Sequence, residues 1–84
     1  MFPNFKKIFL MWKDFIEQKP GVLNGKPVIK GTRIGVDLIL EKLGAGETIE
    51  ELLKAYPTIT RESLLACISY AAASVRNETI IEFL

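Results

Sequence analysis

The chain has 84 residues, of which 49% are apolar and 25% are charged. This length is near the lower limit at which one hydrophobic core holds a domain together, so we expect one domain. It contains no histidine and one cysteine, Cys67, which excludes an imidazole base, a Cys-His nucleophile pair, a histidine metal site and an internal disulfide framework. We therefore expect a cytoplasmic protein that is not an enzyme, with no catalytic residues, no metal and no cofactor.

The formal net charge of +1 conceals a difference between the two halves of the chain. Residues 1–36 carry seven basic and two acidic side chains, whereas residues 37–84 carry four basic and eight acidic ones. A polyanion would therefore be attracted to the N-terminal half. A solvated surface with an incidental asymmetry is the alternative interpretation.

The N-terminal segment is apolar but short. Its uninterrupted apolar run, Ile8 to Trp12, is far below the roughly 20 residues of a membrane-spanning helix, and Lys13 and Asp14 follow it, so we expect no targeting segment and no membrane anchor. Helical spacing predicts an amphipathic helix that docks on the domain or on a second copy, through Phe5, Ile8, Phe9, Trp12, Phe15 and Ile16. Binding to a membrane surface is the weaker alternative.

A short β element is predicted next. Pro20-Gly21 interrupts any preceding element, and Asn24-Gly25 is typical of a tight turn. Val28-Ile29 favours a strand, Pro27 restricts that strand to a sheet edge, and Gly31 ends it. We expect a hairpin or paired arm that another chain completes, and hence a homodimer.

Three amphipathic helices follow. The first includes Val36 to Leu43 and ends at Gly44-Ala45-Gly46. The second begins with a capping box formed by Thr48 and Glu51 and stops at Pro57. The third and longest begins after Thr60, and its broad apolar face is formed by Leu64, Leu65, Ile68, Ala71, Ala72 and Val75. Short connections between them predict a helix-turn-helix arrangement, with Arg61, Ser63, Ala66, Ser69 and Tyr70 pointing outward from the third helix.

A family resemblance covers residues 12–73, about three quarters of the chain. Residues 25–73 read GKPVIKGTRIGVDLILEKLGAGETIEELLKAYPTITRESLLACISYAAA, and this run resembles the bacterial and archaeal domain-of-unknown-function family 433. The resemblance implies a mainly α, homeodomain-like three-helix helix-turn-helix fold with a short N-terminal β element. It also implies a small cytoplasmic dimer similar to VapB-type antitoxins, with a PIN-like nuclease toxin as its partner. Gly35 departs from the family, whose members usually have proline there.

DNA-binding residues are expected on the basic ribbon and at the start of the third helix. The candidates are Lys26, Lys30, Thr32, Arg33, Arg61 and Ser63. Two of them have structural alternatives, because Arg33 is able to pair with Asp37 or Glu41 and Thr32 is able to satisfy a backbone group of the turn.

A partner or dimer interface is expected because the apolar face of the third helix is wider than a tri-helical core requires. The candidates are Leu65, Ala72, Ile80, Ile81, Phe83 and Leu84. Completion of the monomer core is the alternative. The expected division of the chain is an N-terminal extension over 1–11, the antitoxin-like helix-turn-helix domain over 12–76 and an apolar C-terminal tail over 77–84.

The predicted function is that of a small DNA-binding, antitoxin-like regulator of a toxin-antitoxin pair. It would bind operator DNA as a dimer and also bind a nuclease-type toxin. The alternative is a protein-interaction module that neutralises a partner enzyme without binding DNA. An RNA-binding accessory protein is disfavoured, because the sequence has no stacking aromatics on a predicted sheet.

Overall fold

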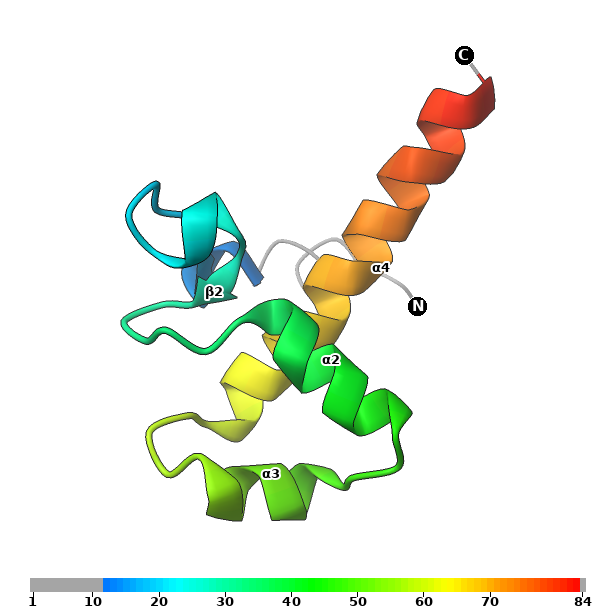
Figure 1. Cartoon of the computed structure of the whole chain (residues 1–84). Helices are drawn as coiled ribbons and strands as arrows, with labels where there is room; N and C mark the ends of the chain where they lie inside the picture. The colour runs from blue at the N-terminus through cyan, green and yellow to red at the C-terminus, as the bar shows by residue number, and fades with distance from the viewer. Residues whose placement is uncertain (1–11, 84) are drawn as a thin grey trace.

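Three helices and a small two-stranded sheet make up the mainly α fold of the protein in the computed structural model (Figure 1). The structure describes residues 12–83, with side chains up to residue 76. In chain order the elements are η1 (Trp12–Asp14), β1 (Ile16–Glu17), η2 (Leu23–Gly25), β2 (Val28–Ile29), α2 (Val36–Gly44), α3 (Ile49–Ala55) and α4 (Arg61–Phe83). The expected helix-turn-helix class with a short β element is confirmed.

Local signals define the ends of the first two helices. Gly46 follows α2 at a φ of 101°, a conformation that glycine adopts without steric cost. The capping box at the start of α3 is confirmed, since the Glu51 N–H donates to Thr48 Oγ1 at 3.1 Å and the Thr48 N–H donates to Glu51 Oε1 at 2.8 Å. The helix α3 ends before Pro57, as expected for a residue that cannot continue the backbone ladder.

The last helix is the longest and extends beyond the rest of the molecule (Figure 1). Thr60 caps it as predicted, because its Oγ1 accepts the N–H of Ser63 at 3.1 Å. The helix continues to Phe83, across the boundary expected at residue 76. In the part of the chain that the structure describes, no helix has the length and apolar character needed to cross a membrane.

The hydrophobic core lies where the sheet and the three helices meet. Its buried apolar side chains are Ile16, Val28, Ile29, Val36, Ile39, Leu52, Ile59, Leu64, Ala66 and Cys67. Each strand and each helix contributes at least one of them, so burial of apolar surface holds the short strands against the helices.

The expected amphipathic N-terminal helix is wrong where the structure describes it. Trp12 lies in a single 3-10 turn and Ile16 lies in β1, opposite Ile29. The ring of Trp12 packs edge-on against Tyr70 of α4, with 4.9 Å between ring centroids. Sheet pairing and burial of Ile16 therefore outweigh the helical spacing of the apolar residues in this segment. The residues Phe5, Ile8 and Phe9 of the predicted helix lie outside the described residues.

Strand β2 is completed on both sides by its own chain. On one side it pairs antiparallel with β1, and Glu17 lies opposite Val28. On the other side the Ile29 N–H donates to the Ile34 carbonyl at 3.0 Å, and the Val36 N–H donates to the Pro27 carbonyl at 3.0 Å. The expected completion of this strand by another chain is therefore wrong, because its edges have no free ladder positions for a second chain.

Gly35, immediately before α2, has a backbone conformation that proline adopts. Its φ is −71°, close to the value that the proline ring imposes, and within the described chain its N–H donates no backbone hydrogen bond. A β-carbon placed there would lie 2.5 Å from Asp37 Oδ1, the movable end of an exposed side chain. The departure from the family's proline is therefore compatible with the same local fold.

We expect Gly35→Pro to stabilise the protein by about 0.5–1 kcal/mol, because it reduces the conformational entropy of the unfolded chain. Thermal unfolding followed by circular dichroism would show a midpoint raised by about 4 °C. Gly46→Pro is the control and should destabilise, because the φ of Gly46 is +101° and its N–H donates to the Leu43 carbonyl. A lower midpoint for Gly35→Pro would contradict this prediction.

Candidate functional site

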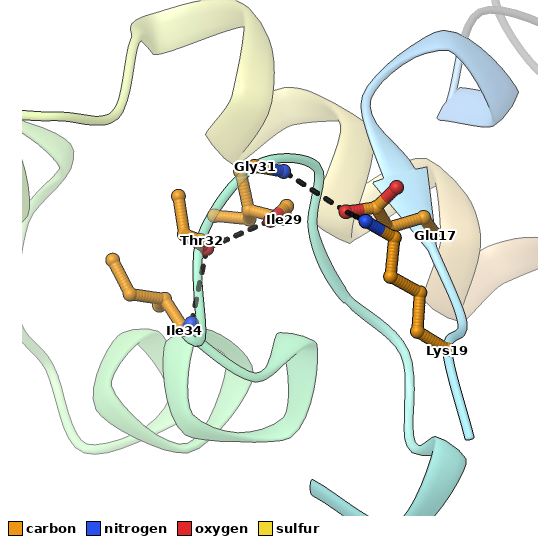
Figure 2. A network of polar contacts seen from close by, with 6 residues as sticks. All are labelled: Glu17, Lys19, Ile29, Gly31, Thr32 and Ile34. Atoms are coloured by element: carbon orange, nitrogen blue, oxygen red, sulfur yellow. Dashed lines mark hydrogen bonds and ion pairs between the residues drawn. The ribbon is translucent and has the colours of Figure 1, made fainter. Parts of the chain in front are cut away.

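The candidate site is the basic turn, which we define as residues 30–33 between β2 and the approach to α2. Gly31 adopts a φ of +79°, which lets the chain reverse direction. Its N–H donates to Oε2 of Glu17 at 2.9 Å, and the Nζ of Lys19 lies 3.7 Å from the same oxygen (Figure 2). A charge-assisted hydrogen bond thus ties the basic turn to β1.

The side chain of Thr32 stabilises the backbone of the basic turn through two hydrogen bonds. Its Oγ1 donates to the Ile29 carbonyl at 2.7 Å and accepts the Ile34 N–H at 3.0 Å (Figure 2). Because a hydroxyl has one proton, this side chain has none left to donate to a phosphate. The structural alternative is therefore confirmed for Thr32, and the predicted phosphate contact would require this hydroxyl to give up its hydrogen bond to Ile29.

Two basic side chains of the turn are exposed. Lys30 and Arg33 form no ion pair with any residue in the range 12–76. Asp37 instead lies 3.9 Å, Oδ2 to Nζ, from Lys26, and both of these side chains are about two-thirds exposed. The expected pairing of Arg33 with Asp37 or Glu41 is therefore wrong, while Lys26 has only a weak, solvent-screened partner.

The start of α4 presents exposed Arg61 and Glu62, but Arg61 is hydrogen-bonded within the protein and Ser63 is buried. Nη2 of Arg61 lies 3.0 Å from Oε2 of Glu50 on α3, and the hydrogen bond from Arg61 lowers the pKa of Glu50. Ser63 is 6% exposed, and its hydroxyl lies 3.1 Å from Thr60 Oγ1. The cap buries Ser63, so the predicted contact of this side chain with base edges would require the start of the helix to rearrange.

An apolar row follows the exposed side of α4, and we call it the α4 row: Leu65, Ile68, Ala72 and Val75. Leu65 is 50% exposed, Ile68 is 43% exposed and Val75 is 63% exposed, and Ala72 is exposed as well. Leu65 and Ala72, both predicted interface residues, therefore share one face. The side chains of Ile80, Ile81, Phe83 and Leu84 lie outside those that the structure describes.

Two more residues that were predicted to point outward from α4 pack against the core instead. Ala66 is 5% exposed and belongs to the core, and Tyr70 packs against the core and Trp12. The broad apolar face predicted for α4 therefore divides into two parts. One part is buried in the core and includes Leu64 and Cys67, and the other is the exposed α4 row.

Two contacts of the candidate site were not predicted from the sequence. Glu17 anchors the basic turn from 14 residues away, and Glu50 engages Arg61 from 11 residues away. For Glu50 a signal existed, because an acidic residue in the first turn of α3 and a basic residue at the start of α4 meet across a helix-turn-helix connection. For Glu17 no local pattern marks a partner so far along the chain.

Cys67 is buried in the core and free of a disulfide. Burial raises the pKa of its thiol from 9.0 to about 11, because the interior disfavours the thiolate. Within the described residues, no group of three or more His, Cys, Asp or Glu side chains is placed to hold a metal ion.

Comparison with known proteins identifies the family of the chain. The family model described as "Protein of unknown function (DUF433)" matches residues 16–71, and the chain belongs to this family. It is 31% identical over 62 residues to the uncharacterised protein y4eO of Sinorhizobium fredii, an alignment that covers 74% of this chain but 28% of that protein. It is also similar to a crystal structure of a DUF433 member from Anabaena variabilis, with a TM-score of 0.72, 30% identity and coverage of 88% of this chain and 73% of that one.

Thr32→Val should destabilise the protein by about 1–2 kcal/mol, because it leaves the Ile34 N–H and the Ile29 carbonyl without their side-chain partner. Thr32→Ser is the matched control and should stay within about 0.5 kcal/mol of the wild type, since it retains the hydroxyl. Urea unfolding measures both variants. Equal stability of the Val and Ser variants would contradict the structural role of the hydroxyl.

The raised pKa of Cys67 predicts a loss of stability at alkaline pH. Between pH 9 and about 11 the unfolded chain releases the thiol proton while the folded chain retains it, so unfolding becomes more favourable as the pH rises. Urea unfolding across this range should show a decline larger by roughly 1–2 kcal/mol for the wild type than for Cys67→Ala. Parallel pH profiles for the two proteins would exclude this cause.

Proposed function

We propose that this protein is a small, non-enzymatic, cytoplasmic, antitoxin-like regulator that contacts DNA through the basic turn and binds a nuclease-type toxin through apolar surface near its C-terminus. The observation that supports it most is the basic turn itself. There, a fixed backbone presents Lys30 and Arg33 to solvent on a helix-turn-helix domain.

The proposed DNA contact is to the phosphate backbone. The backbone of the turn is already ordered, so a phosphate contact costs mainly side-chain entropy, and each contact releases condensed counterions. Lys26 contributes less, because its ammonium group already lies near Asp37. Base reading by α4 plays little part in the proposal, since Arg61 is engaged by Glu50 and Ser63 is buried.

The proposed toxin contact uses the apolar residues that continue along α4. The sequence places Ile80, Ile81 and Phe83 in the last turns of this helix, followed by Leu84. An apolar helix end that extends from a small domain is a common means of entering a groove on a partner protein.

Replacing both Lys30 and Arg33 with Ala should weaken DNA binding and lower the slope of log affinity against log salt concentration by about two, one for each lost phosphate contact. Fluorescence anisotropy with duplex DNA from upstream of the protein's own gene measures both quantities. The control with the same net charge is Lys13→Ala with Lys54→Ala, two exposed basic residues on other elements. Unchanged affinity of the Lys30/Arg33 variant would overturn the assignment of the basic turn.

A second candidate function is supported by the outward face of α4. In a recognition helix this face carries polar side chains that reach base edges, whereas here it carries the apolar α4 row. The protein would then neutralise a partner enzyme without binding DNA. Size-exclusion chromatography of a mixture with a PIN-like nuclease encoded beside it, together with absent DNA binding by the wild type, would favour this candidate.

A further inference from the structure

We infer that the α4 row binds the same row of a second copy of this chain, with the two helices antiparallel. This inference deepens the proposed function, because it names the contact through which the dimer forms, but the contact itself requires no DNA. It depends on the spacing of the row, the sizes of its side chains, the charges at its ends and the extension of α4 beyond the body of the protein.

The spacing of the α4 row is that of a helix-helix seam. Leu65, Ile68, Ala72 and Val75 follow one another at intervals of three, four and three residues, the alternation found at the paired positions of coiled coils. The row covers about 15 Å of helix at a rise of 1.5 Å per residue. The adjoining side of the same helix is committed to the core through Leu64 and Cys67, so α4 has a buried apolar face next to the exposed one.

The sizes of the side chains favour antiparallel pairing. When two copies run in opposite directions, Leu65 lies across from Val75 of the second copy and Ile68 lies across from Ala72 of the second copy. Each layer then combines a larger side chain with a smaller one and fills a similar volume. A parallel pair would place two Ala72 side chains together and leave a gap between two layers of large residues.

The charges at the ends of the row favour the same orientation. Exposed Glu62 lies before Leu65, and exposed Arg76 lies after Val75. An antiparallel pair brings Glu62 of each chain alongside Arg76 of the second copy, whereas a parallel pair brings like charges to the same level. Like charges in close contact are destabilising, so the ends of the row select one orientation.

The shape of the molecule leaves room for such a pair. The C-terminal half of α4 extends away from α2, α3 and the sheet (Figure 1). In the antiparallel arrangement the body of each copy lies beside the extended half-helix of the other. Four side chains per helix bury much less than the 1,200–2,000 Å² or so of a stable interface, so we expect a dissociation constant in the micromolar range.

Sedimentation velocity of the full chain, from about 5 to 500 μM and without DNA, tests the inference. The wild type should change from monomer to dimer, and Ile68→Glu should remain monomeric throughout. Leu38→Glu, at a comparably exposed leucine on α2, is the control and should dimerise like the wild type. A monomeric wild type, or a dimer unaffected by Ile68→Glu in a variant that circular dichroism shows to be folded, would overturn the inference.

Charge exchange tests the orientation. Glu62→Arg and Arg76→Glu should each weaken the dimer about fivefold or more, and the double variant should regain most of the affinity. Failure of the double variant to recover would exclude the antiparallel pair. The Lys30/Arg33 double alanine variant should dimerise normally, so loss of DNA binding in that variant and loss of dimerisation in Ile68→Glu report on separate surfaces.

Discussion

The pairing of β2 on both of its edges is the interaction on which the rest of the structure depends. Val28 and Ile29 are almost fully buried, and the backbone around them bonds to β1 on one side and to the approach to α2 on the other. A two-residue strand is too short to persist alone, so its stability comes from this double pairing and from burial against the helices. Both the position of the basic turn and the start of α2 follow from it.

The two surfaces that carry the proposals have different physical origins. The basic turn is held by hydrogen bonds of Glu17 and Thr32, which fix the backbone and leave Lys30 and Arg33 in solvent. The α4 row arises because a helix in a tri-helical core buries one face, while this helix is apolar on two. One surface suits an anion and the other an apolar partner, so a single small domain is able to present both.

The helices were predictable from the sequence because their signals are local. The capping pair Thr48 and Glu51, the cap Thr60, and Gly46 after α2 act within one helical turn of the residues they affect. The partner of β2 was not predictable in the same way, since Ile16 and Ile29 meet across 13 residues and the helical spacing around Trp12 pointed elsewhere. The site was predicted in part. The position of the basic turn follows from the GKPVIKGTR run. The burial of Ser63 and the hydrogen bond from the Thr32 hydroxyl to Ile29 depend instead on tertiary packing.

Native-state amide hydrogen exchange at Ile29 and Val36 tests the central claim most directly. Their N–H groups donate to Ile34 and Pro27 of the same chain, on the side of β2 away from β1. Both amides should therefore exchange only through global unfolding, and in the Ile68→Glu variant, which is expected not to dimerise through α4, their protection should be the same at about 10 and about 1,000 μM protein. Rapid exchange of either amide, or protection in that variant that rises with protein concentration, would contradict a strand completed within one chain.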